Sequence, residues 1–204
     1  NNYFITYSLK FYSVISYSCD CNADVKEAEK IMSEKQVRRI PVMQNDKIIS
    51  CLAYGGKVNV RCIKSTNIVE TARKAHDLSP TATAALGRLL TITSLMGKEM
   101  KGEKGTITTR VKGDGPIGQM TAVADNLGNV KGFVSNPHVE DVLIRPGKLN
   151  VGAVVGTDGT LTVTKDLSME ENFSGSVELQ SGEIGDDFAY YFTLSEQTPT
   201  AVSC

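Results

Sequence analysis

The sequence of this 204-residue chain predicts an α+β fold, with mixed sheets of short strands and a long central helix, preceded by a partial α/β unit. An apolar stripe at helical spacing runs through 81–100. Short alternating runs, broken by Gly, Asn and Asp turns, fill 105–180. A helix, strand, turn, strand pattern occupies 24–52. The length suits one domain with a smaller appendage.

The smaller predicted unit is the first region, 1–50, in which the role of 1–18 is left open. Residues 25–37 have a helical pattern, and Asp24 is placed to accept from the free N–H groups of the first turn. A strand, a turn and a returning strand are expected over 39–52. The apolar face of this helix consists of Val25, Ala28, Ile31 and Met32.

The second region, 51–204, begins with a predicted strand at 57–63, where apolar and polar residues alternate. Ser79 followed by Pro80 marks a helix start, because a capping hydroxyl precedes a proline whose missing N–H costs nothing at the first helical position. The helix that follows is broadly apolar and is expected to be central. Its stripe comprises Ala85, Leu89, Ile92 and Met96.

The remainder of the second region predicts hairpins and a final helix. Residues 105–180 are rich in Gly, Thr and Val, which indicates a β meander or several hairpins. A helix is expected from 183 to 197, and Pro199 ends it. Its apolar positions are Ile184, Phe188, Tyr191 and Phe192.

Composition argues against several partner classes. Lys and Arg number 22 against 23 for Asp and Glu, so no excess of charge would attract nucleic acid or acidic lipid. No run approaches the ~18 apolar residues of a membrane span, and residues 1–18 lack the features of a signal peptide. We therefore expect a soluble cytoplasmic protein without nucleic-acid or membrane partners.

The five cysteines do not form a regular framework, so disulfide scaffolding is not expected. Cys19 and Cys21 make a C-x-C pair without a second pair or a nearby His, which cannot close a four-ligand zinc shell locally. No metal site is predicted.

A glycine motif, two histidines and three carboxylate pairs are the residues of this sequence that could suggest catalytic or cofactor sites. Residues 113–118 spell G-x-G-x-x-G, but the next residues alternate like a strand, so a turn is favoured over a nucleotide loop. His76 and Asp77 lie at a predicted helix end, and His138 lies in a predicted surface turn. The pairs 140–141, 170–171 and 186–187 cannot converge across a cleft as acid–base carboxylates do. The chain is predicted not to be an enzyme and to hold no cofactor.

Four ordered stretches carry a resemblance to a known family: residues 71–88 (TARKAHDLSPTATAALGR), 113–125 (GDGPIGQMTAVAD), 128–137 (GNVKGFVSNP) and 181–202 (SGEIGDDFAYYFTLSEQTPTAV). They closely resemble the substrate-binding core of the redox-regulated holdase heat-shock chaperone, the thirty-three-kilodalton heat-shock protein family. The resemblance covers about 51–203.

This resemblance implies a molecular chaperone that binds unfolding proteins without ATP during oxidative or heat stress. In that family, cysteines of a C-terminal C-x-C and C-x-x-C set hold zinc when reduced. The resemblance implies that the core is truncated at Cys204, before those cysteines, so the zinc role transfers to no residue here. Unfolded client proteins are the implied partners, and a homodimer is a further expectation.

A second resemblance covers about 13–55. The run DVKEAEKIMSEKQVRRIPVM (24–43), continuing through DKIIS, is similar to the middle of a CBS domain, the adenosine-nucleotide-sensing module named after cystathionine beta-synthase. That family's ribose-holding aspartate has no counterpart in 50–56. A nucleotide-sensing regulatory module and a nonfunctional fusion fragment therefore remain the alternatives to a holdase.

Candidate client-binding residues come from the apolar faces of the two predicted helices, because capture of non-native protein needs apolar surface and no catalytic group. The same side chains also suit a core. They are Leu89, Ile92, Met96, Phe188, Tyr191 and Phe192.

Overall fold

A computed structural model describes residues 4–9, 48–53, 57–100, 105–167 and 172–203. The helices are α2 (Thr66–His76), α3 (Pro80–Gly97), α4 (Val151–Val155) and α5 (Gly185–Leu194). The strands are β1 (Phe4–Leu9), β2 (Ile49–Ala53), β3 (Val58–Ile63), β4 (Thr106–Lys112), β5 (Gln119–Asp125), β6 (Val130–Val134), β7 (Leu143–Arg145), β8 (Lys148–Leu149), β9 (Thr160–Asp166), β10 (Phe173–Glu178) and β11 (Thr200–Ser203).

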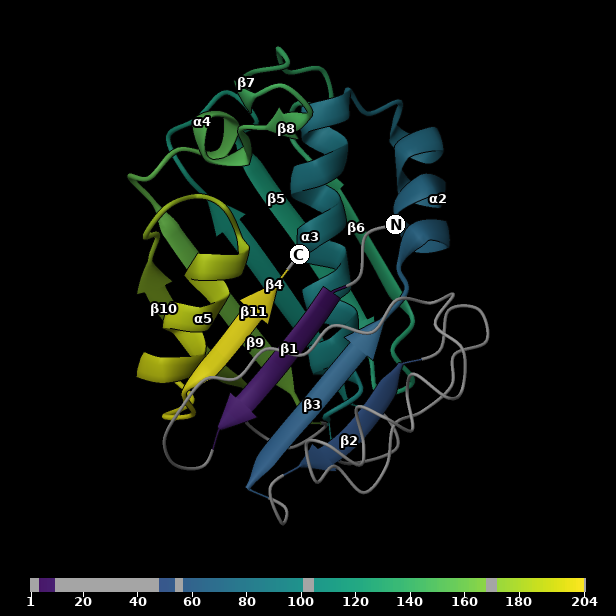
Figure 1. Ribbon diagram of the computed structural model, residues 1–204, viewed down its shortest axis with the longest axis vertical. Coiled ribbons are helices and arrows are strands. Elements are labelled where there is room, and N and C mark those ends of the chain that lie inside the picture. Colours follow the sequence, from purple (N-terminus) through teal and green to yellow (C-terminus); the bar gives the residue numbers. More distant parts are fainter. Residues whose placement is uncertain (1–3, 10–47, 54–56, 101–104, 168–171, 204) are drawn as a thin grey trace.

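Helix α3 contacts both large sheets (Figure 1). One sheet has the strand order β11-β1-β3-β2, the other β10-β9-β4-β5-β6, and every pairing in them is antiparallel. Helix α2 packs beside α3, and α5 packs against β11 and β10. The predicted α+β class with a long central helix is therefore confirmed, but the prediction of mixed sheets is wrong for the described strands, because all of their pairings are antiparallel.

The core is centred on α3, most of whose side chains are buried. Leu86, Leu89 and Ile92 are fully inaccessible and pack with residues of β4, β5, α4 and α5 in one cluster. A small second cluster joins Leu95 to Ile63 of β3. The helix is thus apolar on several sides because it has sheet or helix neighbours on several sides.

The start of α3 differs from the sequence prediction in one respect. Ser79 occupies the N-cap position and Pro80 the first turn, as predicted, but the Ser79 hydroxyl makes no capping bond. It accepts instead from the backbone N–H of Val139, at 3.2 Å. The carboxylate of Asp141 caps the helix, because its Oδ1 accepts from the Thr81 N–H at 2.9 Å and from the Thr81 hydroxyl at 2.6 Å.

The predicted hairpins of 105–180 are confirmed as β4, β5, β6, β9 and β10. Inward positions such as Ile107 and Met120 are fully buried, whereas Thr162 and Thr164 of β9 bond to serines of β10 across the other face. The short helix α4 within this region was not predicted. Its N-cap is Asn150, whose side chain accepts from the Ala153 N–H at 3.0 Å.

The G-x-G-x-x-G motif is a turn, as predicted, and β5 follows it instead of a helix. A Cβ on Gly113 or Gly115 would collide with backbone atoms of Val154 and Val155 at the end of α4. The Gly115 and Ile117 N–H groups donate to the Val155 and Val154 carbonyls at 3.0 and 3.1 Å. The glycines therefore allow two backbones to approach each other.

Two helix ends show how the chain turns. Helix α2 ends at His76, and Asp77 is its C-cap in the left-handed region, which confirms the helix end predicted there. The last helix is shorter than the predicted 183–197, because Ile184 has a φ of 64° and the helix begins only at Gly185. The strand β11 beyond Pro199 was not predicted.

The first region enters the same sheet as the second. Strand β1 pairs with β3 and β11, and β2, which agrees with the predicted returning strand, pairs with β3. The predicted boundary at residue 50 therefore falls within β2. The predicted helix at 25–37 and strand at 39–43 lie outside the described residues, and the CBS-like unit stays a prediction.

Candidate functional site

An open groove of about 770 Å³ lies between α2, α3 and the β5–β6 turn. We call it the α2 groove. Its lining comes from five separate segments and combines aliphatic with polar residues. The aliphatic lining residues are Ile48, Ile63, Ile68, Ala72, Ala75, Leu90, Leu127 and Val130.

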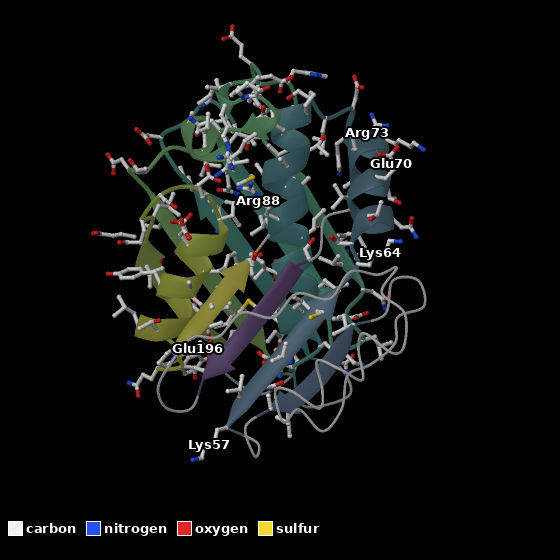
Figure 2. All side chains as sticks on the ribbon, in the orientation of Figure 1. Lys57, Lys64, Glu70, Arg73, Arg88 and Glu196 are labelled. Carbon is white, nitrogen blue, oxygen red and sulfur yellow. The ribbon has the colours of Figure 1, made fainter. Side chains whose placement is uncertain are left out.

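Helix α2 forms one wall of the groove because it is amphipathic. Ile68, Ala72 and Ala75 repeat at helical spacing and line the cavity. Glu70 and Arg73 pair with each other on the exposed side, with Nε to Oε2 at 2.8 Å, and both stand out from the helix in Figure 2. No residue of α2 is fully buried, so the helix lies on the surface of α3 and β6.

The opposite wall is the turn between β5 and β6, which is held by one carboxylate. Asp125 accepts from the backbone N–H groups of Leu127 and Asn129 and from the Asn129 side-chain amide, each at 2.9 Å. The bond from the Asn129 side chain is the main cause that lowers the pKa of Asp125. The Ser94 hydroxyl of α3 donates to the Gly128 carbonyl at 2.6 Å. The turn presents Leu127 with 68% of its surface exposed.

Among the described residues that line the groove, the charged side chains are positive. Lys98, at the end of α3, and Lys131, on β6, both line the cavity, together with His76. No Asp or Glu belongs to this described lining. The groove is therefore suited to an apolar segment that carries acidic neighbours.

The six residues predicted to bind clients do not line the α2 groove. Leu89, Ile92 and Phe188 have no accessible surface, and Tyr191, Met96 and Phe192 retain 1, 4 and 6%. The three aromatic rings pack against one another with centroids 5.8 to 6.5 Å apart. All six therefore act as core in the folded chain, and a role in client binding stays a prediction that requires the core to open.

The groove residues were missed because the strongest apolar stripe in the sequence marks the most buried helix. Leu90, next to the predicted Leu89, does reach the groove. The amphipathic spacing of Ile68, Ala72 and Ala75 was a readable signal for α2. It could not show that α2, α3 and a remote turn would leave a space between them.

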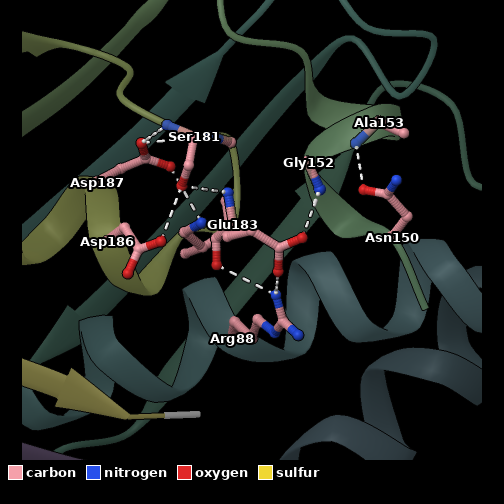
Figure 3. A network of polar contacts seen from close by, with 10 residues as sticks. Arg88, Asn150, Gly152, Ala153, Ser181, Glu183, Asp186 and Asp187 are labelled. Atoms are coloured by element: carbon pink, nitrogen blue, oxygen red, sulfur yellow. Dashed lines mark hydrogen bonds and ion pairs between the residues drawn. The ribbon is translucent and has the colours of Figure 1, made fainter. Parts of the chain in front are cut away.

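Asp187 and Glu183 hold the turn before α5 and the start of α4 (Figure 3). Asp187, fully buried, accepts from the backbone N–H groups of Gln180, Ser181 and Ile184 at 2.7 to 3.0 Å. Glu183 accepts from Arg88 of α3 and from the Gly152 N–H. Asp187 and Asp141 are thus engaged by donors within the protein. Residues 170 and 171 lie outside the described residues, so the interpretation that the carboxylate pairs are not acid–base sites stays a prediction.

Metal binding was tested against the side chains present. Among the residues that the structure describes, no three His, Cys, Asp or Glu side chains converge to hold a metal ion. Cys62 is the cysteine whose side chain is described, whereas Cys19, Cys21 and Cys204 lie outside the described residues. A zinc site therefore does not fit the described part, and its absence from the whole chain stays a prediction.

Other predicted features occupy simple positions. His138 is exposed, as predicted for a surface turn, and lies 3.8 Å from the Asp77 carboxylate. Of the helices in the described part of the chain, none combines the length and the hydropathy that a bilayer span requires.

Comparison with known proteins gives consistent matches over the second region. A family described as "Hsp33 protein" matches residues 46–204. A 33 kDa chaperonin from Alkaliphilus metalliredigens is 54% identical over 159 residues, and one from Bacillus velezensis is 47% identical over 157. These matches cover 78 and 77% of this chain and 54% of each relative, so the chain spans about half the length of these relatives.

A solved structure gives the same result. The crystal structure of the 33 kDa chaperonin, a heat shock protein 33 homolog, from Thermotoga maritima aligns with a TM-score of 0.71 at 37% identity. The alignment covers 76% of this chain and 53% of that one.

Proposed function

The chain belongs to the Hsp33 protein family through residues 46–204, and from that premise we propose that it is the core of an ATP-independent holdase chaperone. It binds unfolding client proteins during oxidative or heat stress. The names of the relatives, 33 kDa chaperonin, support a chaperone. Because the chain spans about half of each relative, its own activity is a proposal.

The observation that carries the proposal is the α2 groove. Its size, about 770 Å³, lies within the range of binding cavities, and aliphatic side chains such as Ile68, Leu90 and Leu127 form part of its lining. A Leu or Phe side chain of a client gains about 1.5–3 kcal/mol on complete burial in such a surface. A few such side chains suffice for reversible capture, and no residue need act chemically.

Independence from ATP is supported by the glycine turn. Gly113 and Gly115 lie against the backbone of Val154 and Val155, so protein atoms fill the side of this turn where a phosphate would have to approach. The carboxylates of Glu183 and Asp187 are bonded to arginine or backbone donors. We propose a binding protein without catalytic turnover.

Regulation by zinc is not part of the proposal for this chain. The three cysteines within 46–204 are Cys51, Cys62 and Cys204, and their spacing contains no C-x-C or C-x-x-C pair. We propose that capture by these residues does not depend on oxidation of those three cysteines. A cytoplasmic location and a homodimer remain further parts of the proposal. The nucleotide-sensing alternative rests on residues outside those described, and no contact favours it.

The test is suppression of aggregation of a thermally unfolding client, followed by light scattering at equimolar chain. We expect suppression above that of an inert protein of similar size, to the same extent before and after peroxide treatment. Scattering equal to that with the inert protein would exclude the holdase. A rise in melting temperature with AMP or ATP would favour the nucleotide module instead.

A further inference from the structure

The hairpin of β7 and β8 exposes a continuous run of large apolar side chains. All of residues 142–148 are exposed, and Val142, Leu143 and Ile144 keep 39, 56 and 51% of their surface. The ladder is irregular between Leu143 and Arg145, and β7 does not alternate between a buried and an exposed side. Such a run is unfavourable in water and indicates a surface that binds a partner.

Both ends of the hairpin are fixed to helices. Asp141, just before β7, accepts from the Thr81 N–H and hydroxyl in the first turn of α3. Asn150, just after β8, donates its backbone N–H to the Val142 carbonyl at 2.7 Å and caps α4 through its side chain. The tip is open, because a Cβ on Gly147 would meet no atom of the described residues within 4 Å. The hairpin is therefore a projecting element on a fixed base.

The charged residues of the hairpin are both cations. Arg145 and Lys148 flank the tip and lie opposite each other in the ladder. Neither forms an ion pair with a residue that the structure describes. Residues 142–149 contain no Asp or Glu, and Glu140 and Asp141 precede the run. Because like charges opposite each other destabilise a strand pair, an anionic partner would stabilise this one.

The hairpin lies away from the α2 groove. Its base contacts Thr81 at the start of α3, whereas Ser94, near the end of that helix, contacts the β5–β6 turn of the groove. The helical rise from 81 to 94 is about 20 Å. Figure 1 shows β7 and β8 beside α4 at one end of the molecule. A partner bound to the hairpin would leave the groove open.

From the exposed run, the open tip and the two cations we infer that the β7–β8 hairpin docks the chain on an anionic lipid surface. Val142, Leu143 and Ile144 enter the boundary between headgroups and acyl chains, and Arg145 and Lys148 contact lipid phosphates. Reversible binding to lipid needs an apolar and a cationic contribution together, because one alone is marginal. The inference is independent of client capture in the groove.

The charge balance of the whole chain, on which the expectation of no membrane partner rests, does not describe this hairpin. Two other occupants suit it less well. In an isologous dimer the hairpin would meet its own copy, so Arg145 and Lys148 would face the same cations. A protein partner would need a concave surface that matches a projecting tip. A lipid surface surrounds the tip without such a match.

The first measurement is flotation of the full chain with vesicles of phosphatidylcholine, with and without phosphatidylglycerol. We expect binding to the anionic vesicles, weaker at high salt, and far less binding to the neutral ones. Leu143→Ser with Ile144→Ser, and separately Arg145→Gln with Lys148→Gln, should each weaken binding at least about tenfold. Absence of binding, or equal binding to the two kinds of vesicle, would overturn the inference.

Matched control variants carry the same changes away from the hairpin. Leu127→Ser alters an exposed leucine at the β5–β6 turn. Lys57→Gln with Lys64→Gln removes two cations that lie away from β7 and β8 (Figure 2). Both controls should weaken vesicle binding much less than the hairpin variants do. Equal effects would show that the chain binds lipid elsewhere and would overturn the inference.

A fluorescent probe identifies what covers the hairpin. The chain has no Trp, so Ile144→Trp supplies a single indole. Its emission should shift to shorter wavelength with anionic vesicles, because the indole leaves water, whereas that of Phe133→Trp, at an exposed position of β6, should not shift. A shift that grows with protein concentration without vesicles would assign the hairpin to a second copy. A shift caused by an unfolding client alone would assign it to client capture, and either result would overturn the inference.

Discussion

Arg88 of α3 and Glu183 form an ion pair across 95 positions of sequence, with Nη1 2.5 Å from Oε2 (Figure 3). The same guanidinium nitrogen donates to the Glu183 backbone carbonyl at 3.1 Å. The other carboxylate oxygen accepts from the Gly152 N–H of α4. One arginine thus connects the central helix to α4 and to the turn that begins α5.

Replacement of this arginine should destabilise the fold. In Arg88→Met the Glu183 carboxylate would remain largely buried without its cation, and we expect a loss of about 1–3 kcal/mol in the free energy of unfolding. Urea denaturation measures it. Arg73→Met, which breaks the exposed pair with Glu70, is the matched control and should change stability much less, because water screens that pair. Equal losses for the two variants would contradict a structural role of the Arg88 pair.

The long-range cap of α3 gives a second prediction. Asp141→Ala removes the acceptor for Thr81 and should cost about 1–2 kcal/mol, since the first-turn N–H would then lack its side-chain partner. Ser79→Ala removes an acceptor for the Val139 N–H but no helix cap, so a smaller loss is expected. Thermal melting by circular dichroism compares the two. A larger loss for Ser79→Ala would restore the local cap that the sequence suggests.

A single charge placed in the α2 groove tests whether clients bind there. Ala75 is exposed and lines the groove, so Ala75→Glu places a carboxylate on the apolar surface without burying it in the core. We expect client suppression to fall at least about threefold, because a client side chain would have to desolvate that charge. Ala153→Glu makes the same change at an exposed alanine of α4 and should leave suppression unaltered. Equal effects would place capture elsewhere.

The lysines of the groove should govern client preference. Lys98→Glu with Lys131→Glu reverses its charge, and binding of an apolar peptide with acidic flanks should weaken by about tenfold or more at low salt. The same peptide with lysine flanks should bind more tightly. Lys57→Glu is the control. Ile63 is the residue of β3 that lines the groove, and Lys57 lies at the opposite end of that strand (Figure 2). Affinities that do not depend on peptide charge would exclude a role of Lys98 and Lys131 in client preference.

Tyr191 predicts how stability changes at alkaline pH. Its hydroxyl donates to Glu196 Oε1 at 2.8 Å, and burial, followed by this bond, raises the pKa of Tyr191 above its ordinary value. A tyrosine of the unfolded chain ionises near pH 10. Above about pH 10 the unfolded state therefore loses a proton that the folded state keeps, and the stability present below that pH declines.

The measurement is the free energy of unfolding between about pH 8 and 11. Tyr191→Phe should show a shallower alkaline decline than the unmodified chain, although it is less stable at neutral pH. Tyrosinate absorbance of the folded protein at about pH 10.5 should be the same in both, since Tyr191 stays neutral there. A drop in that absorbance in the variant would contradict the raised pKa.

Local patterns explain which elements were predictable. The apolar positions around Leu89 and the proline at 80 define α3 within a single segment, and turn residues such as Asp158 and Gly159 define where β9 begins. Each signal depends on neighbours a few positions away. The short α4 gave too little periodicity, and β11 follows Pro199 with only four residues.

The six predicted client residues show the limit of such patterns. A stripe of large apolar side chains has the same sequence pattern whether its side chains pack in the core or bind a client. In this protein Leu89 and Phe188 pack in the core. The α2 groove uses smaller residues such as Ala72 and Ala75, which carry little apolar signal individually.

The sequence by itself determined the family, the central helix, the hairpins and the glycine turn, because these depend on ordered motifs and on short-range periodicity. Only the tertiary structure decided that Asp141 caps α3, that Arg88 meets Glu183, that a groove opens beside α2 and that β1 lies between β3 and β11. Each of these features brings together segments that lie far apart in the sequence. Thr81 and Asp141, for example, are 60 positions apart. Such contacts are selected by the packing of the whole chain, which no local window of sequence contains.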